Sequence, residues 1–467
     1  MKKLLIYGFI FTQLLFLKSC FVAKDYERDE AFEPDENLFR TDEVEKQKDT
    51  TSVAEISWRE VFTDALLQTH IEEALTNNLD SRIALQQIMV ADAFFKEGKA
   101  GYFPEINFSG NVNYQNLAPN SQFGNFFNSI TQYEAPVNLS WEADVWGKIR
   151  SNKRATQAAY LQNVAGHQAI KTELIAQIAT LYYQIASLDE QIQITEKTIE
   201  TRKKSLATTE ALKSSGRLTK VAVKQTEAQV YTAEALLFDL KNELRIAENA
   251  LAILKAEPPH QPERNSLNEQ EIGEKIAMGI PAQLLRNRPD VVAAEYELIN
   301  AFELTNVARA SLYPSFTLNA SAGLQSLTFS DFFSANSFFY NALGGFTQPV
   351  FNRRALRTQL EVAEGQKEQA ALRFQQILLT AGQEVSNAIY SLSMFQERLS
   401  IKEKEFKAYQ DAFEYSEELL KNGMADYLEV LNAQENVLNT QLEVVTNKLQ
   451  VLESSVDLYR ALGGGWQ

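Results

Sequence analysis

The sequence predicts a mainly α-helical chain that also contributes membrane-crossing β-strands and is built from two similar halves. Three observations support this fold class. Similar segments recur about 207 positions apart. Paired segments alternate apolar and polar residues with a period of two, as strands do, and long segments repeat apolar residues every seven positions, as coiled-coil helices do. A chain of 467 residues can hold several domains or one very elongated one.

The first 19 residues have the features of a secretory signal peptide. A basic start precedes an apolar stretch of about 14 residues, which suits export and is too short to span a bilayer. Cys20 follows and is the single cysteine of the chain, so residues 1–19 predict a lipoprotein signal with lipid attached to Cys20. Lys18 departs from the small residue usual at its position, and the alternative is a stray cysteine. Residues 20–57 are charged and poor in apolar residues, which predicts an acylated, extended tether.

Composition argues against several functional classes. The formal net charge of −16 opposes nucleic-acid binding, which needs a basic face. His70, His167 and His260 show no ligand spacing, so no metal site is expected. The sequence has no G-x-S-x-G nucleophile motif, no phosphate-binding glycine loop and no histidine–carboxylate pairing at a spacing useful for catalysis. We therefore expect no enzymatic activity and no cofactor other than the lipid on Cys20.

The duplication sets the expected domain boundaries. AGYFPEINFSG at 100–110 matches ASLYPSFTLNA at 310–320, and other pairs of segments keep nearly the same offset. A polar, Pro-rich segment predicts a linker over 257–278, between a first repeat at 58–256 and a second at 279–467. Each repeat is expected to hold a helix, a β-hairpin and a long helical hairpin. The β-hairpins are expected at about 105–143 and 315–350, and the helical hairpins at about 148–256 and 353–462.

Each expected β-hairpin has an apolar and a polar face. Ile106 and Phe108 alternate with polar residues, and Phe316 and Leu318 do the same. Four strands of about ten residues can cross a bilayer when tilted, but they cannot close a barrel alone, because open edges are not tolerated in lipid. Three chains would supply about 12 strands. Nearby aromatic residues form an interfacial girdle, a loop plug or a small soluble core: Phe123, Phe126, Phe127, Phe329, Phe332, Phe333, Phe338, Phe339 and Tyr340.

The rest of each half predicts long helices. Isoleucines recur every seven residues from Ile178 to Ile199, and Val385 begins the matching series in the second half. Sustained heptads favour coiled-coil packing, although an ordinary helix bundle would show the same pattern. A helix from about 148 to 213 would be ~100 Å long.

Several motifs together resemble the outer-membrane efflux protein family, the TolC-like channel-tunnels, in their lipid-anchored branch. The most specific is GIPAQLLRNRPDVVAAE at 279–295, and SWEADVWGKIR, LYPSFTL, YLEVLNAQ and ALGGGW follow the family's order and spacing. The resemblance covers about Trp58 to Trp466. It implies a homotrimer with a shared 12-stranded outer-membrane barrel and a helical barrel projecting into the periplasm. It also implies passive multidrug-type efflux, with three partners: a periplasmic membrane-fusion adaptor, an inner-membrane pump of resistance-nodulation-division type, and outer-membrane lipid.

Two similar helical turns are the candidate functional sites. KSSGRLTK carries Gly216 and Thr219, and KNGMADYLEV carries Gly423 and Asp426. Glycine suits the end of a helix, and threonine or aspartate suits the N-cap of the next one. The resemblance implies that these tips face the adaptor.

The second turn differs from the first in its acidic residues. The resemblance implies that acidic side chains here line the periplasmic aperture; Glu429 matches one acidic position, Asn432 occupies another, and Asp426 lies nearby. Three Glu429 carboxylates around a narrow pore would favour cations. The alternative is that Glu429 only completes a capping box with Asp426.

Other interpretations stay open at this point. A similar channel could serve type I protein secretion, and the motifs leave the cargo undefined. A periplasmic adaptor would carry one helical hairpin flanked by lipoyl-like strands, and a structural coiled-coil lipoprotein would lack strands. The duplicated β-hairpins argue against both the adaptor and the coiled-coil lipoprotein.

Overall fold

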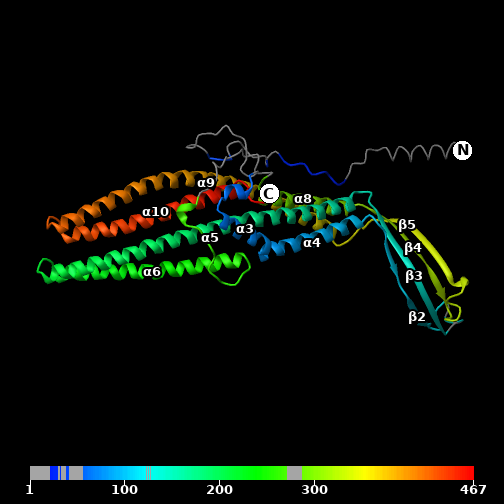
Figure 1. Ribbon diagram of the computed structural model, residues 1–467. Coiled ribbons are helices and arrows are strands. Elements are labelled where there is room, and N and C mark those ends of the chain that lie inside the picture. Colours follow the sequence, from blue (N-terminus) through cyan, green and yellow to red (C-terminus); the bar gives the residue numbers. More distant parts are fainter. Residues whose placement is uncertain are drawn as a thin grey trace. The chain divides into compact units, whose positions relative to one another are not determined.

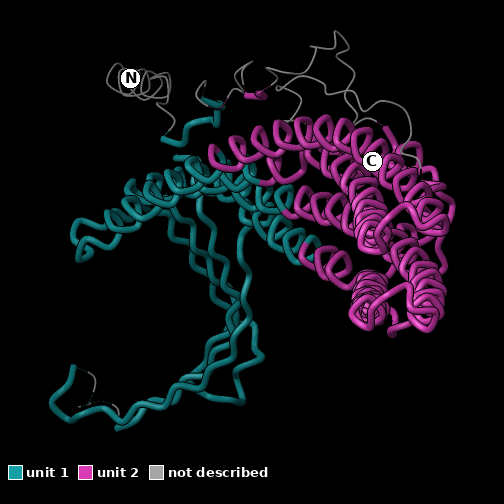
Figure 2. The backbone as a smooth tube through the Cα atoms, turned by 90° about the vertical axis from the view of Figure 1, so that its left-hand side faces the viewer, with its two compact units in different colours: residues 1–29, 88–162, 294–374 teal, residues 30–87, 163–293, 375–467 magenta. Residues whose placement is uncertain are grey.

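The computed structural model describes residues 22–29, 32, 38–40, 56–122, 124, 126, 128–270 and 287–466. They form two compact units, which Figure 2 shows in different colours. Unit 1 draws its described residues from 1–29, 88–162 and 294–374, and unit 2 draws them from 30–87, 163–293 and 375–467. Each unit therefore combines both halves of the sequence. The predicted signal peptide and Cys20 lie outside the described residues.

The long helices occur in pairs of equal length. α5 (Lys148–Ser214) and α9 (Ala355–Lys421) each have 67 residues, and α6 (Lys220–Leu254) and α10 (Tyr427–Ala461) each have 35. In Figure 1, α6 lies beside α5 and α10 lies beside α9, as helical hairpins. The matching lengths confirm the predicted internal repeat. The shorter helices are α2 (Trp58–Val61), α3 (Ala65–Asn77), α4 (Leu79–Ala100), η3 (Leu267–Glu269), α8 (Pro289–Ala310) and η5 (Ala335–Ser337).

Among the described residues, none of the helices combines the length and the hydrophobicity that a transmembrane helix needs.

Unit 1 contains an antiparallel sheet with the order β1/β2–β3–β4–β5. β1 and β2 pair with β3 in one continuous register, and the ladder is interrupted where Ser109 meets Pro136. Proline has no N–H to donate, although the Ser109 N–H still donates to the Pro136 carbonyl at 3.1 Å. β1 and β2 thus form one interrupted strand, and the described sheet has the four strands that were predicted. The bounds are β1 (Glu105–Phe108), β2 (Asn111–Asn116), β3 (Ser129–Ala143), β4 (Ser315–Ser326) and β5 (Phe338–Thr347).

The register divides this sheet into an apolar and a polar face, because residues directly opposite each other share a face. Val137 lies opposite Phe108 and Ala322, and Ala322 lies opposite Tyr340. The neighbouring row is polar: Asn107, Asn138, Ser321 and Asn341. Phe108 is 74% exposed and Tyr340 is 80% exposed, so the described chain does not itself cover the apolar face.

The sheet also has open edges. β1/β2 and β5 are its outermost strands, and each pairs on one side only within the described residues. Unpaired strand edges in lipid would leave backbone N–H and C=O groups without hydrogen bonds. A single copy of this sheet is therefore unsuited to a membrane.

The core of unit 2 lies between its long helices. Ile178 and Ile185 of the α5 heptad series are fully buried, and Ile192 and Ile199 are 9% and 8% exposed. In α9, Val385 is fully buried, but the later members of its series are only half-buried. The second hairpin therefore leaves part of its apolar stripe uncovered in one chain.

Two motifs quoted above meet in unit 2. The Arg288 guanidinium donates to the Ala461 carbonyl at 3.1 Å, and the Trp466 indole donates to the Asn287 carbonyl at 2.9 Å. Gly463 has φ +89°, and a Cβ at this position would lie 2.5 Å from the Asn287 carbonyl oxygen. The NRPD and ALGGGW segments thus fix the end of the chain against the start of α8.

The expected linker is partly described, over residues 257–270, and these are held on unit 2 by polar contacts. Arg264 donates to Asp189 at 2.6 and 2.8 Å and to Glu248 at 2.7 Å. A ring nitrogen of His70 lies 2.8 Å from the Glu263 carbonyl oxygen. From composition alone this segment looks like a plain connector. The contacts that fix it were not visible in the sequence, because the partner residues are far away along the chain.

Candidate functional site at the helical turns

Both helical hairpins of unit 2 turn through the same backbone motif. Gly216 and Gly423 have φ +77° and +74°, which favours glycine because it has no Cβ. At the first turn the Arg217 N–H donates to the Leu212 carbonyl at 2.9 Å, and at the second the Met424 N–H donates to the Leu419 carbonyl at 2.9 Å. With the inner bonds of Gly216 and Gly423, at 3.0 Å each, these contacts form Schellman motifs.

The next helix of each hairpin begins at an N-cap. The Thr219 hydroxyl accepts from the Ala222 N–H at 3.3 Å, and the Asp426 carboxylate accepts from the Leu428 N–H at 3.3 Å. In the described part of the chain, the exposed Glu429 carboxylate makes no hydrogen bond or ion pair, so the reciprocal bond of a capping box is not formed. Glu429 and Asn432 are both exposed, and their spacing of three residues places them next to each other on one side of α10. Asp426 is the N-cap that precedes this helix.

The two turns are joined inside unit 2. Ala222, Tyr427 and Leu431 form a buried cluster, against which Leu218 and Leu420 pack. The Thr226 hydroxyl and the Tyr427 hydroxyl share a hydrogen bond. Further along the helices, the Gln434 amide donates to the Ser205 hydroxyl at 3.0 Å. The tips of the two hairpins are therefore held together by both apolar and polar contacts.

This packing explains why the first turn lacks an acid. Ala222 stands where the second turn has Glu429, and it is only 9% exposed because Tyr427 and Leu431 cover it. A carboxylate at position 222 would be buried without a cationic partner, which is costly. The sequence shows the difference between the turns, but the buried contact that causes it joins residues about 205 positions apart.

We expect Ala222→Glu to separate the two tips, because burying an unpaired carboxylate costs at least ~2 kcal/mol. The measurement is the rate of limited proteolysis at the two turns, which should rise. Val221→Glu is the matched control, since Val221 is 65% exposed, and it should leave the rate nearly unchanged. Equal rates for both variants would contradict the buried contact at Ala222.

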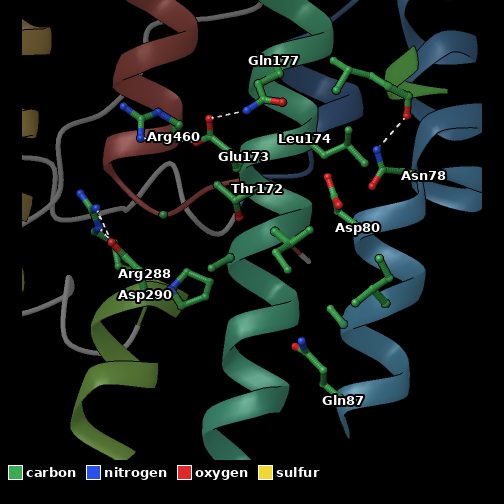
Figure 3. Close-up of a pocket in the computed structure, with 17 residues that line it drawn as sticks. Asn78, Asp80, Gln87, Thr172, Glu173, Leu174, Gln177, Arg288, Asp290 and Arg460 are labelled. Atoms are coloured by element: carbon green, nitrogen blue, oxygen red, sulfur yellow. Dashed lines mark hydrogen bonds and ion pairs between the residues drawn. The ribbon is translucent and has the colours of Figure 1, made fainter. Parts of the chain in front are cut away.

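Unit 2 also has a cavity of about 570 Å³ between α4, α5, the start of α8 and the end of the chain. Figure 3 shows Arg288 paired with Asp290 on one side and Glu173 beside Gln177 on another. The Arg460 guanidinium lies 3.6 Å from Glu173. Burial lowers the pKa of Arg288, but the neighbouring Asp290 and Glu384 outweigh it, so the pKa lies above its ordinary value.

The chemistry of this cavity does not suggest catalysis or metal binding. Its lining residues include no histidine or cysteine, and the described residues contain no group of three or more side chains suited to a metal ion. Its charges are used mainly in ion pairs that connect helices. The turns, rather than this cavity, remain the candidate functional site.

Comparisons with known proteins match nearly the whole chain. The family model described as "Outer membrane efflux protein" matches residues 70–255 and 280–464. The cation efflux system protein CusC of Escherichia coli O6:H1 is 26% identical over 459 residues, covering 98% of each chain. The solvent efflux pump outer membrane protein SrpC of Pseudomonas putida is 28% identical over 458 residues, covering 97% of each chain.

Solved structures show the same fold. A crystal structure of CusC aligns with a TM-score of 0.84 at 25% identity, covering 96% of this chain and 100% of that chain. The open state of the Neisseria gonorrhoeae MtrE outer membrane channel aligns with a TM-score of 0.85 at 24% identity, covering 96% and 99%. The two matched segments of the family model correspond to the repeated helical hairpins and sheet strands described above.

Proposed function

Because the chain belongs to the outer membrane efflux protein family, we propose that three copies assemble into the passive outer-membrane channel of a tripartite efflux system. The chain is an outer-membrane efflux protein, with its strands in the membrane and its long helices in the periplasm. The trimer is inferred mainly from the sheet, which has one apolar face and, within the described residues, two open edges. Three such sheets would join edge to edge into about 12 strands, and no edge would remain.

The half-buried apolar series of α9 supports the same assembly. Neighbouring copies would cover it, as coiled-coil partners do. A conduit of this kind changes no covalent bond and needs no catalytic residues or cofactor. Outer-membrane fractions should contain a trimer that resists heating in detergent; a chain that runs only as a monomer would contradict the assembly.

The partners in this proposal are a periplasmic adaptor and an inner-membrane pump, most simply of the resistance-nodulation-division type. The relatives differ in what their names say they export, cations for CusC and solvents for SrpC, so the cargo is not assigned. The tips around Gly216, Thr219 and Gly423 are the proposed adaptor surface. Cysteines at the exposed Ser215 and Asn422 should cross-link to a co-expressed adaptor, and absence of an adduct would argue against docking there.

The proposal includes a lipid on Cys20. The lipid would hold the N-terminus at the membrane, and residues 22–29 would connect it to unit 1. Those residues are fixed within unit 1. The side-chain amide of Asn306 donates to the Lys24 carbonyl at 2.9 Å and its oxygen accepts from the Lys24 N–H at 3.3 Å. Intact-mass measurement of the mature protein would detect the acyl groups. A type I secretion channel is the alternative export role, and the companion pump would distinguish the two.

We propose that Glu429 lines the periplasmic aperture, together with Asn432 and the nearby Asp426. Its carboxylate is exposed and unused by the cap, so in a trimer three such charges can face one passage. Glu429→Gln should therefore lower cation selectivity and alter conductance in planar bilayers, because a ring of carboxylates favours cations. Glu418→Gln, an equal loss of charge at an exposed site on α9 near the same turn, should have little effect. Identical records for Glu429→Gln and wild type would leave the residue without an aperture role.

A further inference from the structure

The apolar face of the sheet carries aromatic residues at both of its ends, as well as Phe108 and Tyr340 between them. Near the helices of unit 1, the Trp141 indole donates to the Tyr102 carbonyl at 3.0 Å, and Phe316 and Phe346 lie side by side with ring centroids 6.1 Å apart. At the opposite end, Tyr133 occupies the same face, because it lies opposite Val112. Aromatic girdles at both membrane interfaces are a general feature of outer-membrane sheets.

The β4–β5 loop adds three phenylalanines beside Tyr133. The Tyr133 ring centroid is 5.5 Å from that of Phe329 and 6.4 Å from that of Phe332, and Phe332 is 5.1 Å from Phe333. Phe332 is 9% exposed, whereas Phe329 and Phe333 are 63% and 76% exposed. One ring therefore anchors the loop to the sheet, and the other two are presented outward.

Hydrogen bonds hold this loop in shape. The Thr328 hydroxyl donates to the Asp331 carboxylate at 2.7 Å, and the Ser337 hydroxyl donates to the Asp331 carbonyl at 2.7 Å. Residues 327–337 contain one acid and no lysine or arginine. Because the loop is already ordered, the exposed rings would lose little conformational entropy when they contact a partner. The loop has no lysine or arginine with which to bind an anionic group.

The spacing of the aromatic residues along the strands can be compared with the thickness of the membrane. Tyr133 and Trp141 are eight residues apart on β3, which is about 27 Å along a strand. A tilt of roughly 40° reduces this to about 21 Å of height, whereas the apolar band of an outer-membrane barrel is about 25 Å tall. Tyr133 would therefore lie inside the apolar band. Tyr114 lies opposite Thr131 on the same face, about 7 Å further along the strands, and Phe329 and Phe333 of the loop would join it at the outer border.

We propose that residues 327–337 dock on outer-leaflet lipid and complete the outer aromatic girdle. The loop would continue the lipid-facing side of the sheet, since Tyr133, the β3 residue that Phe329 and Phe332 contact, lies on the face opposite to the one that carries Asn138 and Ser321. It is not a plug of the channel. This inference rests on the proposed function, because it requires the sheet to stand in the outer membrane as part of a closed barrel.

The test uses the full chain with single nitroxide labels at Phe333→Cys, Val137→Cys and Asn138→Cys, reconstituted in phosphatidylcholine–phosphatidylglycerol vesicles. Collisions with oxygen report lipid, and collisions with a water-soluble nickel chelate report water. Wild type, labelled in parallel, measures any signal from Cys20. The oxygen-to-nickel ratio should be highest at Val137, lowest at Asn138 and intermediate at Phe333, as expected for the interface.

The outcomes separate the inference from the proposed function. If Val137 and Asn138 do not differ, the sheet is not a membrane barrel and both proposals fail. If they differ but Phe333 matches Asn138, only the docking of the loop on lipid is overturned. As a second measurement, Phe329→Ser with Phe333→Ser should leave single-channel conductance unchanged, whereas a plug would give a conductance increase and overturn the proposal.

Discussion

Replacing Arg288 with methionine should lower the free energy of unfolding by about 3 kcal/mol. The Arg288 side chain is 7% exposed and makes ion pairs with Asp290 at 2.6 Å and Glu384 at 2.8 Å. Methionine would fill much of the volume but remove the Arg288 donor from both carboxylates and from the Ala461 carbonyl. Removing one partner of a buried ion pair typically costs about 3–5 kcal/mol, and the 42% exposure of Asp290 favours the lower end.

Urea unfolding of the detergent-solubilised protein, followed by circular dichroism, would measure this loss as a lower midpoint. Arg373→Met is the matched control, because the Arg373–Glu297 pair is exposed, at 61% and 35%, and such pairs contribute less than ~1 kcal/mol. Equal midpoints for both variants would contradict a structural role for Arg288.

The same ion pair predicts a pH dependence. Burial raises the pKa of Asp290, but the hydrogen bond and charge of Arg288 outweigh it and hold the pKa below its ordinary value. The folded state then gains stability from this carboxylate above its unfolded pKa and loses it as the pH falls through the lowered value. The difference between wild type and Arg288→Met should therefore shrink in acid.

The features that the sequence predicted well are local. Helices follow from heptads such as Ile178 to Ile199, strands follow from alternation around Ile106 and Phe108, and the turn glycines follow from the demand for positive φ at Gly216 and Gly423. Each depends on residues within a few positions of one another. The internal repeat was visible because both halves keep the same local patterns at one offset, and the equal helix lengths confirm it.

The features that could not be predicted depend on distant partners. The break of the first strand at Ser109 follows from Pro136 on the neighbouring strand. The absence of an acid at Ala222 follows from its burial against Tyr427 and Leu431. In the same way, spacing alone does not separate a girdle from a plug for the loop phenylalanines, because the girdle that we propose is argued from the register that places Tyr133 on the apolar face.

Gly463→Ala should destabilise the end of the chain by about 3 kcal/mol. Two effects add. A φ of +89° is unfavourable for any residue with a Cβ, at a cost of roughly 1–3 kcal/mol. The new Cβ would also lie 2.5 Å from the Asn287 carbonyl oxygen and 2.7 Å from its carbon, and this backbone is held by the hydrogen bond from Trp466. Either the C-terminal segment or the start of α8 must move.

Gly166→Ala provides the matched control with the opposite sign. Gly166 lies within α5, and a Cβ there would have open space around it, so alanine should stabilise the helix by about 0.5–1 kcal/mol. Both variants replace a glycine of unit 2 with alanine. They differ in the backbone φ at the substituted position and in the space available for the new Cβ. If both raised the urea midpoint, the close approach of Gly463 to Asn287 would not constrain the fold, and the terminal glycines would need another explanation.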